Sequence, residues 1–253
     1  MSVFRLTMLV TILSLVSQVA AQTNPKIVII IDDLGYQFAA GQRAIALPGP
    51  VSFAVLPATP NGRALAHAAY AQGKEVLLHL PLESVGHSGP TEPGGITLDM
   101  DQAAFTSAFD AALESVPHAI GVSSHRGSLL TRHPGHMQWL MHEISARDGM
   151  FFLDSFTTHQ SVAMQVAAEA GVAATRRHVF LDNDRSPAAI GREFERLTRL
   201  ANQNGVAVGI GHPYPETLAF LERRLAELEK YAVELIPISK AINYVEPGGS
   251  KKL

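Results

Sequence analysis

Short apolar runs alternate with segments of helical periodicity from Lys26 onward. The apolar runs cover residues 27–31, 51–56, 75–79, 119–123, 150–153, 178–181, 206–210 and 233–238. The helical segments between them cover residues 62–72, 101–115, 136–147, 161–170, 187–203 and 215–230. In the last segment leucines recur every three or four residues and so share one face of a helix. Strands and helices that alternate about eight times predict an α/β fold with a parallel sheet, either open or closed into a barrel.

Polar residues follow the predicted strands. The strand ends carry Asp32 and Asp33, then His79 and Glu83, then His125 and Ser128, and then Asp154, Asp182 and His212. Because the carboxyl ends of parallel strands share one rim, where such folds build their active sites, we expect these side chains to converge. The loop at residues 84–95, rich in glycine and proline, is expected to form a lid or a substrate rim.

Several of these residues also have a purely structural interpretation. A histidine that ends a buried strand is often an ordinary core residue, and Asp33 could cap a helix that starts near Tyr36. Asp154 and Asp182 could also be helix N-caps, and for Asp182 the cap is the favoured interpretation. What favours a functional site is that two adjacent aspartates, three histidines and a glutamate are expected on one rim.

Adjacent carboxylates at the end of a buried strand need a compensating charge. Desolvating either of Asp32 and Asp33 is costly unless a cation, a proton or solvent offsets it. Carboxylates and imidazoles without sulfur suit a divalent cation of hard or borderline character. One aspartate would bind this cation, and its neighbour would act as a base on water. No glycine-rich phosphate loop and no G-x-S-x-G motif is present, which disfavours phosphate-loop and serine-triad chemistry.

Composition limits the class of protein. The chain has 253 residues, of which 47% are apolar and 17% charged, and this suits one globular domain with a large core. The net charge is −3 and no basic tract occurs, so nucleic acid is not expected as a partner. Cysteine is absent, which excludes disulfides, thiolate metal sites and a cysteine nucleophile.

The first 21 residues are interpreted as a signal peptide. They combine Arg5, an apolar stretch and a small-residue end with Val19 and Ala21 at the positions that a cleavage site requires. A single domain is expected over residues 22–253, with its core at about 26–245. The product is expected to be exported to the periplasm and to keep no stable membrane span after cleavage. An uncleaved anchor is the minor alternative, because the apolar run is shorter than the ~20 residues of a spanning helix.

Six motifs resemble those of a known family. VIIIDDLGYQ, LPGPVSFAVLP, GKEVLLHLPLE, FFLDS, VFLDN and IGHPYPETL are similar to motifs of the divergent polysaccharide deacetylases, relatives of the NodB-type carbohydrate esterases. The resemblance extends over nearly all of residues 26–245. It implies a NodB-like distorted (β/α) barrel of about seven to eight parallel strands with surrounding helices. It also implies a metal-dependent hydrolase that removes acetyl groups from an envelope glycan, either peptidoglycan or another N-acetylated polysaccharide.

The resemblance also assigns roles to residues. Asp32 matches the catalytic base of the family and Asp33 a metal ligand. His79 matches the first histidine of the H-x-x-x-H motif, whereas Glu83 stands where the second histidine would be. Residues 209–212 resemble the late Leu-x-His motif, so His212 is expected to be the general acid.

One family motif is missing, and this leaves alternatives open. Residues 124–128 replace the arginine- and proline-rich motif, and His125 could restore a second imidazole ligand. We favour Asp33, His79 and His125 as ligands of one divalent ion, with zinc as the expected metal. Glu83 is either a fourth ligand or a residue that orients a ligand. Ser128 and Asp154 are further candidate binding residues.

Two other functions compete with deacetylation. The altered histidine motif and the missing arginine motif motivate a protein that binds glycan or a cell-wall enzyme without catalysis. A metal phosphoesterase is less favoured, because its usual two-metal site would need more acids close to Asp32 and Asp33.

Overall fold

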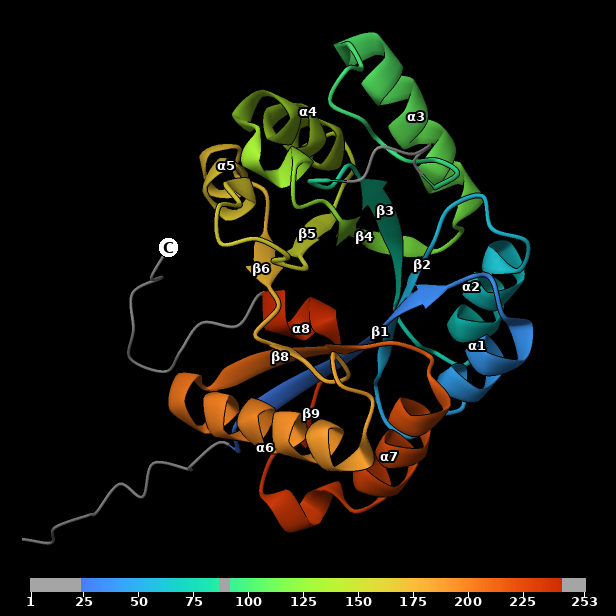
Figure 1. Ribbon diagram of the computed structural model, residues 1–253, viewed down its shortest axis with the longest axis vertical. Coiled ribbons are helices and arrows are strands. Elements are labelled where there is room, and N and C mark those ends of the chain that lie inside the picture. The colour runs from blue at the N-terminus through green and yellow to red at the C-terminus, as the bar shows by residue number, and fades with distance from the viewer. Residues whose placement is uncertain (1–23, 87–91, 243–253) are drawn as a thin grey trace, which may run out of the picture.

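A parallel sheet wrapped by helices forms the molecule (Figure 1). The computed structural model describes residues 24–86 and 92–242. The strands are β1 (Lys26–Leu34), β2 (Ser52–Val55), β3 (Val76–Leu82), β4 (Ala119–Arg126), β5 (Phe151–Asp154), β6 (Ala174–Arg176), β7 (Val179–Phe180), β8 (Val206–Gly211) and β9 (Glu234–Leu235). The α-helices are α1 (Phe38–Ile45), α2 (Gly62–Ala71), α3 (Gln102–Ser115), α4 (Pro134–Ser145), α5 (Ala163–Glu169), α6 (Pro187–Asn204), α7 (Pro215–Ala226) and α8 (Ile238–Ile242). Two short 3-10 helices are η1 (Leu130–Arg132) and η2 (Leu228–Tyr231).

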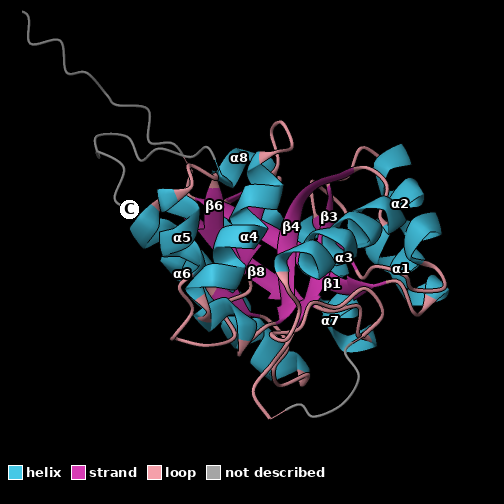
Figure 2. Cartoon of the chain, turned by 90° about the horizontal axis from the view of Figure 1, so that it is seen from above, coloured by secondary structure: helices cyan, strands magenta, loops and turns pink. Residues whose placement is uncertain are grey.

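The strand order confirms the predicted fold class. Eight strands lie in the order β6-β5-β4-β3-β2-β1-β8-β7, and the short β9 pairs with the beginning of β1. Every strand pair is parallel. Seen from above, the strands lie at the centre and helices surround them (Figure 2). The sheet curls into a half-barrel, and its strand ends therefore share one rim.

The two faces of the sheet bury different side chains. In β1, Ile27, Ile29 and Ile31 belong to the large outer core that the surrounding helices cover. Val28 and Ile30 point to the inner, concave face and share a smaller core with residues of α8. This alternation follows from the period of two along a strand, and it makes β1 apolar on both faces. Even-numbered positions of β1 therefore face inward.

Two local predictions differ from the structure. The sequence did not predict β6, because its three residues are partly exposed and form no apolar run. The apolar run at residues 233–238 was expected to be one strand, yet only Glu234–Leu235 pairs with β1. Pro237 follows Ile236, and α8 begins at Ile238. Since proline fits the start of a helix and cannot donate to a strand, it ends the strand there.

Two further points concern the ends of the chain. The expected signal peptide at residues 1–21 lies outside the described residues, as does the last part of the expected domain core at residues 243–245. Within residues 24–86 and 92–242, every helix is too short or too polar to cross a membrane.

Candidate functional site

Inner-face positions of the strands continue into polar side chains at the rim. Asp32 stands two residues beyond the inward-facing Ile30, and His79 two residues beyond Leu77. His212 stands two residues beyond Ile210, just past the end of β8. On β4, Ser123 pairs with His79 of β3, and His125 pairs with Pro81. His125 therefore stands two residues closer to the carboxyl end of β4 than the partner of His79. The period of two thus aims four widely separated side chains into one space.

Asp33 would point away from this space if β1 were regular. It does not, because its backbone has a φ of 60° and the pairing of β1 with β2 shifts between Ile31 and Leu34. This left-handed conformation turns the Asp33 carboxylate inward beside that of Asp32. As a result, Nε2 of His79 lies 3.5 Å from Oδ2 of Asp32 and 3.1 Å from Oδ1 of Asp33. A non-glycine residue with positive φ is a local strain that is often found at functional sites.

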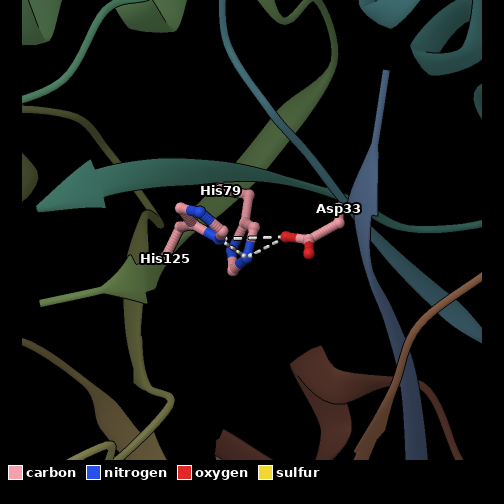
Figure 3. Close-up of side chains that lie close together, drawn as sticks. All are labelled: Asp33, His79 and His125. Carbon is pink, nitrogen blue, oxygen red and sulfur yellow. Dashed lines mark hydrogen bonds and ion pairs between the residues drawn. The ribbon is translucent and has the colours of Figure 1, made fainter. Parts of the chain in front are cut away.

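Three donor atoms form a small triangle above the rim (Figure 3). Oδ1 of Asp33 lies 3.1 Å from Nε2 of His79 and 2.9 Å from Nδ1 of His125. The two ring nitrogens are 3.1 Å apart. Asp33, His79 and His125 come from β1, β3 and β4 and point toward one another. We call these three side chains the ligand triad.

The ligand triad fits a divalent metal ion. Two imidazoles and one carboxylate are the donor set of several catalytic zinc sites and also suit related borderline ions. Ligands about 2.1 Å from a tetrahedral ion are about 3.4 Å apart, so the observed separations need to widen by only a few tenths of an ångström. Three protein ligands also leave a position open for water or substrate.

The outer nitrogen of each imidazole has its own partner. Nδ1 of His79 lies 2.7 Å from the hydroxyl of Ser123, and Nε2 of His125 lies 3.2 Å from Oε1 of Glu92. If these outer nitrogens donate, Nε2 of His79 and Nδ1 of His125 carry lone pairs that face the centre of the triad. Such contacts fix the tautomer and the ring orientation of a metal-binding histidine.

The two adjacent aspartates have opposite electrostatic environments. Burial raises the pKa of Asp32, and the charges of His79 and His212 only partly offset this effect. Burial would also raise the pKa of Asp33, but its contacts with His125 and His79 outweigh burial and hold that pKa well below its ordinary value. Oδ1 of Asp32 is buried and has no hydrogen-bond partner among the described residues. Two carboxylates with pKa values pushed apart are suited to different chemical roles.

His212 follows β8, the strand that pairs with β1, and is held by Asp182. Nδ1 of His212 lies 2.8 Å from Oδ1 of Asp182, and Nε2 lies 3.9 Å from Oδ2 of Asp33. Burial would lower the pKa of His212, but the hydrogen bond and charge of Asp182, with smaller contributions from Asp32 and Asp33, raise it to about 9. The imidazole is therefore protonated at neutral pH, with Nε2 facing the site.

The preferred helix-cap interpretation of Asp182 is wrong. Helix α6 begins at Pro187, and the hydroxyl of Ser186 accepts a hydrogen bond from the amide of Ala189, so Ser186 is the N-cap. Asp182 instead accepts hydrogen bonds from the amide of His212 and the hydroxyl of Thr217. The helix-cap interpretations of Asp33 and Asp154 are also wrong, because the N-cap of α1 is Gln37 and the N-cap of α5 is Val162.

The structure does not bring the remaining candidate residues to the ligand triad. Oε2 of Glu83 accepts a hydrogen bond from the amide of Leu98 at 2.7 Å. The hydroxyl of Ser128 accepts one from the amide of Val85 at 3.1 Å. Both side chains thus tie loop segments to the rim.

Asp154 is engaged in the turn after β5. One oxygen accepts from the amide of Phe156 at 2.8 Å, and the other accepts from the hydroxyl of Ser161 at 2.7 Å. Burial raises the pKa of Asp154, and these hydrogen bonds oppose the rise. The side chain therefore stabilises the turn that follows a rim strand.

Sequence reasoning did not predict the roles of three residues that surround the site. Ser123 and Glu92 contact the outer nitrogens of the ligand triad, and Asp182 holds His212. The inward position of Ser123 could have been found from the period of two on β4. Asp182 is expected at a strand end, but its contact with His212, which lies 30 residues further along the chain, has no signal in the sequence. For Glu92, the only signal was its presence in the long loop at residues 84–95.

Comparisons with known proteins agree with the geometry. The divergent polysaccharide deacetylase family matches residues 29–242. An uncharacterised protein of Haemophilus influenzae is 37% identical over 203 residues, which cover 80% of this chain and 72% of that protein.

Two solved structures share the fold. An uncharacterised protein from Agrobacterium tumefaciens superposes with a TM-score of 0.82 at 23% identity, covering 88% of this chain and 91% of that one. A CE4-family pseudoenzyme from Bacillus anthracis superposes with a TM-score of 0.52 at 11% identity, covering 87% and 66% of the two chains. At these identities the likeness shows the fold alone.

Proposed function

Because the chain belongs to the divergent polysaccharide deacetylase family, we propose that it is a metal-dependent hydrolase that removes acetyl groups from an envelope glycan. The observation that carries this proposal is the ligand triad, with Asp32 and His212 next to it. A base, an acid and three metal-binding atoms within one rim are the parts that hydrolysis of an amide or ester requires. Zinc is the ion that we expect at this donor set.

Asp32 is suited to act as the base. A divalent ion held by the ligand triad would supply Lewis acidity toward an acetyl carbonyl and toward water. Asp32 has a buried oxygen without a partner among the described residues, and its raised pKa makes it a stronger proton acceptor than an ordinary carboxylate. We infer that Asp32 accepts the proton of the attacking water.

His212 is suited to act as the acid. Asp182 occupies Nδ1 of the ring, so the proton on Nε2 faces the site, and a pKa of about 9 keeps this proton in place at neutral pH. We infer that His212 donates this proton to the amine or hydroxyl that leaves. Per turnover Asp32 gains one proton and His212 loses one, so transfer of a proton from Asp32 to His212 through solvent restores the starting state.

Exposed apolar side chains at the rim support a glycan as substrate. Tyr36 and Phe38 are each 50% exposed and follow β1, and Val85 is 58% exposed and follows β3. Burial and the negative charges of Glu92 and Asp33 raise the pKa of the Tyr36 phenol. Aromatic faces at the edge of a polar site suit the apolar faces of sugar rings. An N-acetylated polysaccharide such as peptidoglycan is the expected substrate class.

We also propose that the protein works in the cell envelope, most simply in the periplasm. This proposal is supported by the signal-like residues 1–21, with Val19 and Ala21 ahead of the expected cleavage point. Amino-terminal sequencing of the protein recovered from a periplasmic extract tests it, and we expect the mature chain to begin near Gln22. Retention of Met1 on the membrane fraction would favour the uncleaved anchor.

Acetate release is the direct test of the activity. The protein loaded with one equivalent of zinc should release acetate from acetylated chito-oligosaccharides or muropeptides. The metal-free protein should release none, and restoring zinc should restore the rate. If the loaded protein bound glycan but released no acetate from either substrate, the alternative of a non-catalytic glycan-binding protein would replace the hydrolase.

A further inference from the structure

Glu92 contacts the metal-facing histidine of β4 from outside the ligand triad. Its Oε1 lies 3.2 Å from Nε2 of His125, the ring nitrogen opposite the one that faces Asp33. Glu92 is far from β4 in the sequence and belongs to the segment after β3. We propose that Glu92 is the positioning residue of the metal centre, which holds the His125 ring in its metal-binding orientation and so sets the affinity for the ion. This inference rests on the metal centre of the proposed function.

A bound ion would require one arrangement of the His125 ring. Nδ1 lies 2.9 Å from Asp33 and 3.1 Å from His79, so this nitrogen must keep a free lone pair to bind an ion. The ring proton therefore belongs on Nε2, where the Glu92 carboxylate accepts it. A carboxylate behind a metal-binding imidazole fixes the tautomer and makes the imidazole a stronger donor. Ser123 provides the corresponding contact for His79, but as a neutral hydroxyl.

Glu92 also contacts a guanidinium. Oε1 of Glu92 also lies 3.1 Å from Nη2 of Arg126, the residue that follows His125. The carboxylate is therefore shared between a guanidinium and an imidazole, which limits the cost of its partial burial. Arg126 adopts a φ of 57°, so the backbone turns sharply just after His125 and leaves its side chain beside the same carboxylate. Glu92, His125 and Arg126 thus form one connected group.

Glu83 offers a matched comparison within the same region. It lies on the same side of the rim, and both carboxylates border one small cavity with His125. The Glu83 carboxylate, however, accepts a hydrogen bond from the amide of Leu98. Removing Glu83 would loosen the segment without changing what the imidazole contacts. Comparing substitutions of Glu92 and Glu83 therefore distinguishes a specific role of Glu92 from a general effect of the loop.

Zinc affinity of the metal-free full chain provides the test. Competition against a chromophoric zinc chelator gives the dissociation constant for the wild type, Glu92→Gln, Glu92→Ala, Glu83→Gln and Glu83→Ala. We expect Glu92→Gln to weaken zinc binding by about 10-fold and Glu92→Ala by up to about 100-fold, because loss of such an outer contact typically costs this much. The Glu83 variants should bind zinc as the wild type does. Thermal unfolding of the metal-free variants checks that each one folds.

A nitrogen-detected NMR spectrum of the ring supplies a second readout. In the zinc-bound wild type, the His125 signals should show a proton on Nε2 and the metal on Nδ1. In Glu92→Ala the signal of the Nε2 proton should be lost to exchange with water.

Three results would overturn the proposal. Equal affinity of Glu92→Ala and the wild type would remove the role of Glu92 while leaving the metal centre in place. Equal losses in the Glu92 and Glu83 variants would assign the effect to the segment and not to the contact with His125. If the wild type itself bound no zinc, both this inference and the metal centre of the proposed function would fail.

Discussion

The two ends of the curled sheet each carry carboxylates, but these have different hydrogen-bond partners. At the amino end, the carboxylate of Glu75 accepts hydrogen bonds from the amide and the hydroxyl of Ser239, and it lies 3.5 Å from the hydroxyl of Ser52. At the carboxyl end, Asp32 keeps a buried oxygen without a partner among the described residues, and Asp33 adopts a strained backbone conformation. The first end attaches α8 to the sheet, whereas the second leaves a carboxylate oxygen of Asp32 without a hydrogen bond among the described residues.

This contrast distinguishes a structural acid from a functional one. A buried carboxylate that contributes to stability has its oxygens engaged by local donors. A carboxylate that is meant for chemistry is left incompletely paired, and the fold must stabilise it elsewhere. Glu75 is only partly buried and Asp32 is fully buried, but the clearer difference lies in their hydrogen-bond partners. Substitutions at the two ends should therefore have different consequences.

Loss of a triad ligand should have the largest effect. We expect Asp33→Asn and His79→Ala to lower zinc affinity by more than the roughly 100-fold that an outer contact can cost, because the first removes the negative charge of a ligand and the second removes a ligand atom. Acetate release at a fixed zinc concentration should fall with it. Equilibrium titration with zinc measures the effect, and Ser128→Ala is the control that should bind normally. Full affinity in both ligand variants would show that the triad does not hold the ion.

Loss of the base should abolish most turnover while sparing the metal. Asp32→Asn keeps the size of the side chain but removes the proton acceptor, so acetate release should fall by about 10²- to 10⁴-fold. Zinc content, measured by elemental analysis, should stay near one equivalent. A variant that retains the wild-type rate would show that Asp32 is not the base.

Asp182, the hydrogen-bond partner of His212, should set the alkaline limit, which is the pH above which activity is lost. Because the folded protein raises the pKa of His212 from 6.5 to about 9, the proton that acts as the acid is present at neutral pH and is lost as the pH rises through about 9. In Asp182→Asn this limit should move down toward 6.5, and the optimum should narrow. Acetate release measured from pH 5 to about 10 tests the shift. An unchanged alkaline limit would remove Asp182 from this role.

The contact between His212 and Asp182 should also make the stability of the folded protein fall as the pH rises. A histidine with a raised pKa stabilises the folded state fully below the unfolded pKa of about 6.5, and this contribution is lost as the pH rises through about 9. The difference in unfolding free energy between the wild type and Asp182→Asn should therefore shrink over this range.

Loss of the structural acid should have the smallest effect on function. Glu75→Ala removes the charged acceptor of the amide and the hydroxyl of Ser239, and loss of these hydrogen bonds should lower the free energy of unfolding by about 1–3 kcal/mol. Zinc affinity and acetate release should stay at wild-type values at a temperature where the variant is folded. Denaturant unfolding and zinc titration of the same preparation separate the two effects. A loss of zinc affinity comparable to that of His79→Ala would remove the distinction between the two ends.

Most of the fold and part of the site can be predicted from the sequence. Apolar runs located eight of the strands, and the period of two explains why Asp32, His79, His125 and His212 face one space. The short β6 could not be predicted, because a three-residue edge strand has no pattern of its own.

Other features depend on backbone geometry that residue types do not encode. The inward turn of Asp33 requires a positive φ and a shift in strand pairing, and neither has a sequence signal at an aspartate. Glu92 reaches His125 through the path of a long segment, and Asp182 reaches His212 across two strands. Each of these contacts joins residues that lie about 30 positions apart along the chain.

An anomalous-scattering experiment at the zinc edge tests the central claim most directly. In crystals of the full chain grown with zinc, we expect one strong peak within about 2.1 Å of Oδ1 of Asp33, Nε2 of His79 and Nδ1 of His125. A peak that Glu83 binds in place of His125, or a peak away from all three atoms, would contradict the account.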